Sequence, residues 1–153
     1  MLTAKGGDLD VFAYGSLMSE SVLQVLLQRL PTMRPAVLRG FRRYKLDGRS
    51  YPAVAPHLPS DAVCGVLLCN LSAAEVATLN AFEDPVYERR LVPVWLTDIP
   101  SSSAVEALAY VQANDEGPML IRDWSLGEFE SSPLYPEYLE RCREFRSNYV
   151  AKK

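Results

Sequence analysis

The sequence contains little of what metal centres and disulfide-bonded domains need. It has one histidine, His57, and three cysteines, Cys64, Cys69 and Cys142, among 153 residues. Cys64 and Cys69 are five positions apart on one expected strand, so their side chains face opposite sides and do not easily share a zinc ion. An odd number of cysteines without compact spacing also argues against a disulfide framework. We therefore expect no metal site.

Long apolar runs and an excess of positive charge are also lacking. No run approaches the ~20 residues that cross a bilayer, and Met1–Asp10 lacks the apolar core of a signal peptide. The net charge of −3 does not favour binding to nucleic acids or membrane surfaces. We expect a cytoplasmic protein with one packed domain, residues 11–150, after a flexible N-terminus, residues 1–10.

The first third of the chain predicts a strand, a loop and a helix in that order. Val11–Tyr14 is apolar and aromatic, and Gly15-Ser16 interrupts it, which indicates a short buried strand that ends in a turn. Hydrophobic residues then recur at helical spacing as far as Leu30. Ser19 is the expected N-cap of this helix, and Pro31 is its expected end.

Most of the chain beyond Pro31 predicts strands with short helices between them. Asp47-Gly48 between two extended runs is a strong β-hairpin signal. The run 63–71 is apolar enough to be buried on both faces, and Pro93 favours an edge or bulged position for its strand. Because the order is not a regular βαβα alternation, we expect an α+β fold with a mixed, barrel-like sheet. The expected strands are residues 37–46, 49–55, 63–71, 87–96 and 104–113.

Short helices and a C-terminal helix are expected to flank this sheet. Ser72–Glu75 is a capping box that opens a short helix, and Pro85 prevents its continuation, so Glu83 lies in its last turn or just past it. A weaker capping box at Ser125–Glu128 indicates another short helix. One face of the C-terminal helix is formed by Tyr138, Leu139, Cys142, Phe145 and Tyr149.

Two segments carry residue types that suit chemistry. The loop Tyr14-Gly15-Ser16-Leu17 joins a strand to a helix, so its glycine permits close approach of a ligand and its N–H groups suit a carboxylate or a developing oxyanion. An ordinary turn would have the same sequence. Glu83 has apolar neighbours at the rim of the expected sheet, which would raise its pKa and suit a general base. A solvated glutamate at a helix end is the alternative.

A run of alternating basic and aromatic residues allows a different interpretation. Arg39, Phe41, Arg43 and Lys45 share one face of an expected strand, and such interleaving can bind RNA. The acidic net charge favours a solvated strand face instead. We therefore expect no nucleic-acid partner.

Three stretches carry a family resemblance. They are Val11–Met18, the block from Leu38 to Ala53, and Leu79–Glu83 followed by Tyr87–Val94. Together they resemble the gamma-glutamylcyclotransferase-like superfamily, in particular its branch named for plant avirulence-induced genes. The resemblance runs from about Val11 to Ala113, and the tail after Asp123 resembles the plant branch with less specific residues.

The resemblance implies a fold, an activity and roles for particular residues. Enzymes of this family act on a gamma-glutamyl amide, whose own α-amine attacks its γ-carbonyl to leave 5-oxoproline. Glu83 would be the catalytic base, and Tyr87 would be a pocket wall or a hydroxyl partner of Glu83. Small gamma-glutamyl substrates are implied, whereas metals, other cofactors and a covalent nucleophile are not required. The implied substrate cradle is Tyr14, Gly15, Ser16 and Leu17.

The sequence departs from the family pattern beside Glu83. Asp84-Pro85 follows it where many relatives have glycine, and Asp84 adds a second negative charge. Two alternatives therefore stay open, namely a binding module that holds a small molecule without turnover, and another amide or acyl-transfer reaction in the same pocket. The leaving amine and the oligomeric state are not predicted.

Overall fold

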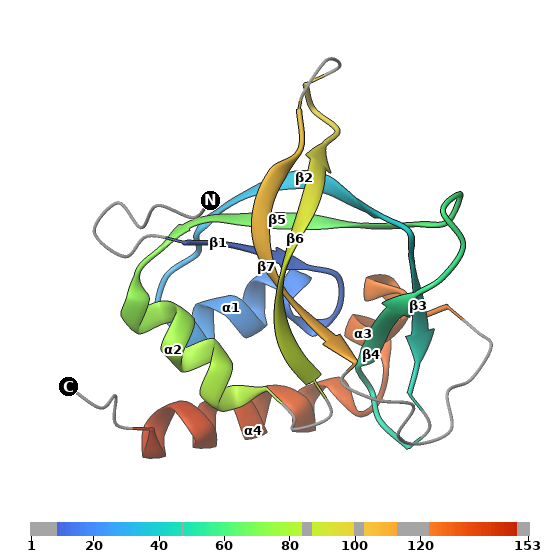
Figure 1. Ribbon diagram of the computed structural model, residues 1–153. Coiled ribbons are helices and arrows are strands. Elements are labelled where there is room, and N and C mark those ends of the chain that lie inside the picture. The colour runs from blue at the N-terminus through green and yellow to red at the C-terminus, as the bar shows by residue number, and fades with distance from the viewer. Residues whose placement is uncertain (1–8, 47, 84–86, 100–102, 113–122, 150–153) are drawn as a thin grey trace.

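Five strands close into a barrel in the computed structural model, and helices pack against one side of it (Figure 1). The structure describes residues 9–46, 48–83, 87–99, 103–112 and 123–149. The strand order in the barrel is β1-β5-β2-β6-β7, and β3 and β4 form a separate two-stranded sheet. The predicted α+β class with a mixed, barrel-like sheet is confirmed. In chain order the elements are β1 (Leu9–Ala13), the short 3-10 helix η1 (Ser16–Met18), α1 (Glu20–Leu27), β2 (Thr32–Arg39), β3 (Phe41–Lys45), β4 (Pro52–Pro56), β5 (Ala62–Leu71), α2 (Ala73–Phe82), β6 (Tyr87–Leu96), β7 (Val105–Gln112), α3 (Leu126–Ser131) and α4 (Tyr135–Asn148).

The barrel wall separates two hydrophobic clusters. β1 pairs antiparallel with β5 and closes the barrel through a parallel contact with β7, where Val11 lies opposite Leu108. Side chains alternate along each strand, so Phe12 and Leu67 join the cluster inside the barrel. Val11 and Leu68 join the cluster on its outer face, under the helices. We call these the interior cluster and the helix-side cluster.

The strand β5 is buried on both faces only in part of its length. Leu67 and Leu68 are buried on opposite faces, as the apolar run predicted. Cys64 is exposed, however, because β1 pairs with β5 only from Val66 onward. The expectation of two buried faces over the whole run 63–71 was therefore wrong at its beginning.

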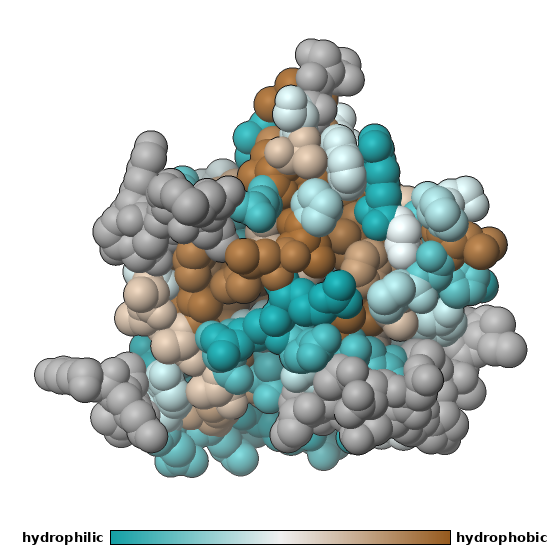
Figure 2. Space-filling view, in the orientation of Figure 1, coloured by the Kyte–Doolittle hydropathy of each residue, from teal (hydrophilic) through white to brown (hydrophobic). Residues whose placement is uncertain are grey.

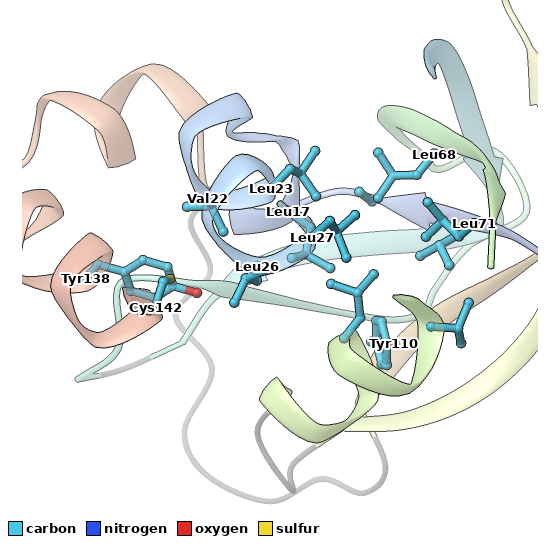
Figure 3. Close-up of a cluster of buried hydrophobic side chains, with 14 of the residues drawn as sticks. Leu17, Val22, Leu23, Leu26, Leu27, Leu68, Leu71, Tyr110, Tyr138 and Cys142 are labelled. Carbon is cyan, nitrogen blue, oxygen red and sulfur yellow. The ribbon is translucent and has the colours of Figure 1, made fainter. Parts of the chain in front are cut away.

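The helix α1 forms where predicted but ends earlier. The Ser19 side chain accepts a hydrogen bond from the Val22 N–H at 3.5 Å, as expected of an N-cap. Gln28 adopts a left-handed conformation with φ +62° and ends the helix before Leu30, which is 44% exposed. A continuation to Pro31 was therefore wrong. The buried side of α1 fills the helix-side cluster shown in Figure 3 with Val22, Leu23, Leu26 and Leu27.

Two paired strands flank Asp47-Gly48 as predicted, but the first is shorter than expected and the second, β4, begins at Pro52 rather than at residue 49. β3 and β4 pair antiparallel, with Arg43 opposite Val54; Asp47 lies outside the described residues. The run 37–46 breaks at Gly40, whose φ of +80° suits glycine. The residues before Gly40 belong to β2, which begins at Thr32 and lies in the barrel. One expected strand is thus two strands in two sheets.

The second half of the chain follows the sequence pattern closely. Ser72 and Glu75 form the predicted capping box of α2, and β6 spans Tyr87–Leu96 as expected. Pro93 pairs in register with Glu106 on β7 and lies outside the pairing with β2, which involves Trp95 and Leu96. Hydrophilic side chains gather at the lower edge of Figure 2, where α4 lies. No helix within the described ranges is long and apolar enough to cross a membrane.

Candidate functional site

One cavity brings together the two segments that the sequence singled out. It has a volume of about 180 Å³ and lies where the end of β1, the end of α2 and the start of β6 meet α4. Segments almost 70 positions apart therefore share one concave surface. The chemical roles expected of these residues stay predictions. The expected site residues that line the cavity are Tyr14, Gly15, Ser16, Leu17, Glu83 and Tyr87.

The other cavity walls were not anticipated from the sequence. Most of them are aromatic, and five of the eight tyrosines of the chain line the cavity. The sequence shows that a tyrosine can be buried, but not which distant segment it faces. The helical pattern of α4, for example, predicted Tyr138 as a packing residue only. The unanticipated residues include Tyr51, Pro52, Phe82, Tyr110, Tyr138 and Arg141.

The loop after β1 is shaped by contacts with β4. Gly15 has φ −134°, and the Met18 N–H donates to its carbonyl at 2.8 Å to form the 3-10 turn. A Cβ added to Gly15 would lie 2.7 Å from Cδ of Pro52, which is too close without movement. From the sequence, this glycine was expected to permit the close approach of a ligand. In the structure it is the proline ring of β4 that makes the close approach.

The helix α4 holds the same loop from the other side. The Tyr138 hydroxyl donates to Oγ of Ser16 at 2.9 Å, and both groups are buried. One turn earlier, the Tyr135 hydroxyl lies 2.8 Å from Oγ of Ser19. Hydrogen bonds that are buried and satisfied restrict a loop to one geometry. The backbone of Ser16 and Leu17 is therefore fixed by residues more than a hundred positions away.

Tyr14 is fixed at both its side chain and its backbone. Its hydroxyl donates to the Tyr110 carbonyl. Its own carbonyl accepts a hydrogen bond from the Arg43 guanidinium at 2.9 Å. Burial, and then the charge of Glu83, raise the pKa of Tyr14 well above its usual value, so its side chain is a neutral phenol.

Arg43 corrects the expectation of a solvated strand face. Its side chain is only 14% exposed and forms an ion pair with Asp123 at 2.7 Å. It also donates to the Cys64 carbonyl at 3.2 Å, in addition to that of Tyr14. Arg39, which was assigned to the same face, lies on β2 and stacks on Trp95 at 4.1 Å. The alternating pattern was misread because Gly40 divides it between two strands.

Glu83 lies where α2 ends and the chain leaves the helix. It is the C-cap residue, with φ −66° and ψ 146°, and its N–H donates to the Leu79 carbonyl at 3.0 Å. Its side chain is half-buried and lines the cavity. The sequence had predicted this position from Pro85, which prevents the helix from continuing. Asp84-Pro85, the departure from the family pattern, lies outside the described residues.

The carboxylate of Glu83 is surrounded by phenols. Burial is the main cause that raises the pKa of Tyr87, Tyr110 and Tyr138, and the negative charge of Glu83 contributes to each shift. These hydroxyls therefore stay protonated near neutral pH, and no second anion forms among them. Tyr87 is a cavity wall, but its hydroxyl donates its proton to the Pro52 carbonyl rather than to Glu83.

Metal-binding side chains are sparse around the cavity. Within the described ranges, no three His, Cys, Asp or Glu side chains gather in a way that would hold a metal ion. The three cysteines are free, and none of them lines the cavity. Among the described lining residues, the chemical groups that face the cavity are the Glu83 carboxylate, the Arg141 guanidinium, hydroxyls and backbone amides.

Comparisons with known proteins show the family and the fold of this chain. The chain is 39% identical to AIG2-like protein D of Arabidopsis thaliana over 137 residues, which cover 89% of this chain and 88% of that protein. A solution structure of another Arabidopsis thaliana protein has 30% identity and a TM-score of 0.68, covering 97% of this chain and 89% of the other. A structure named gamma-glutamyl cyclotransferase shares the fold, with 20% identity, a TM-score of 0.57 and coverage of 95% and 92%. Residues 11–127 match the family model described as gamma-glutamyl cyclotransferase, AIG2-like, and the chain belongs to that family.

Proposed function

We propose that this protein is a gamma-glutamyl cyclotransferase in which Glu83 is the general base. The observation that carries the proposal is the convergence of Glu83 and the loop from Tyr14 to Leu17 on one small cavity. The family and the fold are of the gamma-glutamyl cyclotransferase type and support a reaction of this class.

The proposed reaction is a cyclisation within one substrate molecule. The α-amine nitrogen forms a bond to the γ-carbonyl carbon, and the amide C–N bond breaks. An α-amine has a pKa of about 7.7–8.0, so it must lose a proton before it attacks. Glu83 accepts this proton and returns one to the leaving nitrogen, and such general base catalysis is typically worth about 10²–10⁴-fold. The products are 5-oxoproline and a free amine.

The rest of the site serves to position the substrate. Nucleophile and carbonyl belong to one molecule, so binding must hold that molecule in a ring-like pose. The first N–H groups of the turn at Ser16 and Leu17 have no partner within that turn. They would hold the substrate's α-carboxylate or the developing γ-oxyanion, and hydrogen bonds fixed in advance by Tyr138 reduce the cost of doing so. The neutral tyrosines, including Tyr87 as a wall, would exclude water.

The test is release of 5-oxoproline from gamma-glutamyl dipeptides, gamma-glutamyl-lysine and glutathione. Glu83→Gln keeps the shape of the side chain but cannot accept a proton, so we expect kcat/KM to fall by about 10²–10⁴-fold. Glu144→Gln, which removes an exposed carboxylate of α4, is the matched control and should have wild-type activity. If the wild type releases no 5-oxoproline at high enzyme concentration but binds these molecules, the protein is a binding module. If it releases another product, a different amide or acyl transfer takes place.

Three further expectations from the sequence belong to the same proposal. Residues 11–150 would form one domain, because the helix-side cluster joins side chains from Val11 to Cys142. The partner would be a small gamma-glutamyl molecule rather than a nucleic acid or a membrane. The location would be cytoplasmic, which fractionation of cells that express a tagged chain would test.

A further inference from the structure

A larger hollow adjoins the cavity. It has a volume of about 880 Å³ and shares two wall residues, Tyr51 and Arg141, with the cavity of about 180 Å³. Pockets that enclose a drug-sized ligand have volumes of about 300–1,000 Å³. The small cavity can therefore take only part of a gamma-glutamyl peptide, whereas the larger hollow has room for the rest.

Arg141 stands at the junction of the two spaces as a cation with no carboxylate partner among the described residues. Its guanidinium lies 5.5 Å from the centre of the Tyr138 ring, and its side chain is exposed. Glu137, one turn earlier on α4, also lines the hollow but forms no ion pair with it. Other arginines do pair with carboxylates at 2.6–3.0 Å; they are Arg29, Arg34, Arg43 and Arg143.

The positions of Glu83 and Arg141 bear on how a substrate would be oriented across the two spaces. Glu83 lines the small cavity but not the larger hollow, whereas Arg141 lines both. A glutamyl group that presents its amine to Glu83 and extends through the small cavity towards Arg141 would place its leaving group in the larger hollow. Among the residues that the structure describes, Lys45, Arg49 and Arg141 face this hollow, as do the acidic residues Glu128 and Glu137.

We infer that the larger hollow is the leaving-group subsite, and that Arg141 binds a carboxylate on the leaving group close to the scissile amide. The inference rests on the proposed function and makes Arg141 a specificity-determining residue. In a gamma-glutamyl α-amino acid, that carboxylate is attached to the carbon next to the amide nitrogen. A simple gamma-glutamyl alkylamide has no such group. A guanidinium and a carboxylate form a charge-assisted hydrogen bond, which an uncharged leaving group cannot replace.

Two ligands that differ only in this carboxylate provide the test. They are gamma-glutamyl-alanine and gamma-glutamyl-ethylamide. Their dissociation constants are measured by calorimetry with the Glu83→Gln variant, because this variant should consume neither ligand. Adding Arg141→Gln should weaken binding of the alanine ligand about tenfold, as expected for one partly exposed charge-assisted hydrogen bond. Binding of the ethylamide should not change. Arg143→Gln is the control, because Arg143 lies on the same helix but lines neither space.

The outcomes separate this inference from the proposed function. If Arg141→Gln weakens both ligands equally, the guanidinium binds the α-carboxylate that every substrate carries, and the inference is overturned. The same holds if it weakens neither ligand, or if neither ligand binds. If the wild type forms no 5-oxoproline but the selective loss of affinity is measured, the cyclotransferase proposal fails and the subsite stands. Circular dichroism confirms that each variant is folded.

Discussion

The interior cluster and the helix-side cluster of the barrel wall use their buried side chains differently. Inside the barrel, the cluster is almost entirely aliphatic, and Tyr14 alone among its buried members contributes a hydroxyl. On the helix side, Tyr110 and Tyr138 are buried beside the aliphatic residues of α1, and their hydroxyls bind α2 and the loop at Ser16. The comparison indicates that the interior is mainly a packed core that reaches the site through Phe12 and Tyr14, whereas the helix side fixes the geometry of the site with further hydroxyls.

The largest effect on stability is expected inside the barrel. Leu67 is 2% exposed and lies away from the cavity, so Leu67→Ala should lower the free energy of unfolding by about 2–5 kcal/mol. Urea unfolding measures this change, and activity per folded molecule should not differ from the wild type. Leu91→Ala, at a residue that is 49% exposed on the same barrel, should cost less than about 0.5 kcal/mol. If the two substitutions lowered the free energy of unfolding equally, the contrast between interior and surface would not hold.

An intermediate effect is expected where α4 holds the loop. Tyr138→Phe keeps the ring, which packs edge-on against Phe82 and Phe129, but removes the hydrogen bond to Ser16. The free energy of unfolding should fall by about 0.5–1.5 kcal/mol, and kcat/KM should fall because the loop is less fixed. Tyr135→Phe removes the matching contact with Ser19, outside the cavity. It should have a similar cost in stability but wild-type kcat/KM, and a loss of activity in both variants would contradict a specific role for Tyr138.

The smallest effect is expected at the N-terminal end of α2, far from Glu83. Hydrogen bonds from Arg29, and then from the Ser72 N–H, hold the pKa of Glu75 below its usual value. A carboxylate with a lowered pKa stabilises the fold above its unfolded pKa of about 4.3, and this contribution is lost as the pH falls through the folded value. Glu75→Gln should therefore cost about 1 kcal/mol or less at pH 7. The difference from the wild type should shrink at pH 3, as measured by urea unfolding at both values.

Local sequence signals predicted most of what one segment can specify by itself. The Ser72–Glu75 capping box predicted the start of α2, and Pro85 predicted its end and hence the position of Glu83, because both signals depend on nearby residues only. The loop at Gly15 was recognisable because it interrupts an apolar strand. Gly40 was missed as a break, since a glycine between two extended runs does not reveal its positive φ. Its consequence was the error that placed Arg39 on the same strand face as Arg43.

Local sequence signals could not predict the residues that other segments contribute to the site. A helical pattern shows that Tyr138 is buried, but the identity of the loop that it contacts depends on how α4 packs. The same is true of Pro52, whose ring fits against Gly15 through the placement of β4. Arg141 has the sequence context of an ordinary surface arginine. Its position at the mouth of the cavity follows from the packing of α4 alone.

The parallel contact between β1 and β7 has a consequence for the order in which the molecule can be assembled during translation. One edge of β1 has no partner until Val105–Gln112 has left the ribosome, and an exposed strand edge is prone to pair with other chains. The cavity needs still more of the chain, because its walls extend from Phe12 to Arg141. A nascent chain therefore exposes this edge for most of its synthesis, and the site is complete only after α4 has emerged.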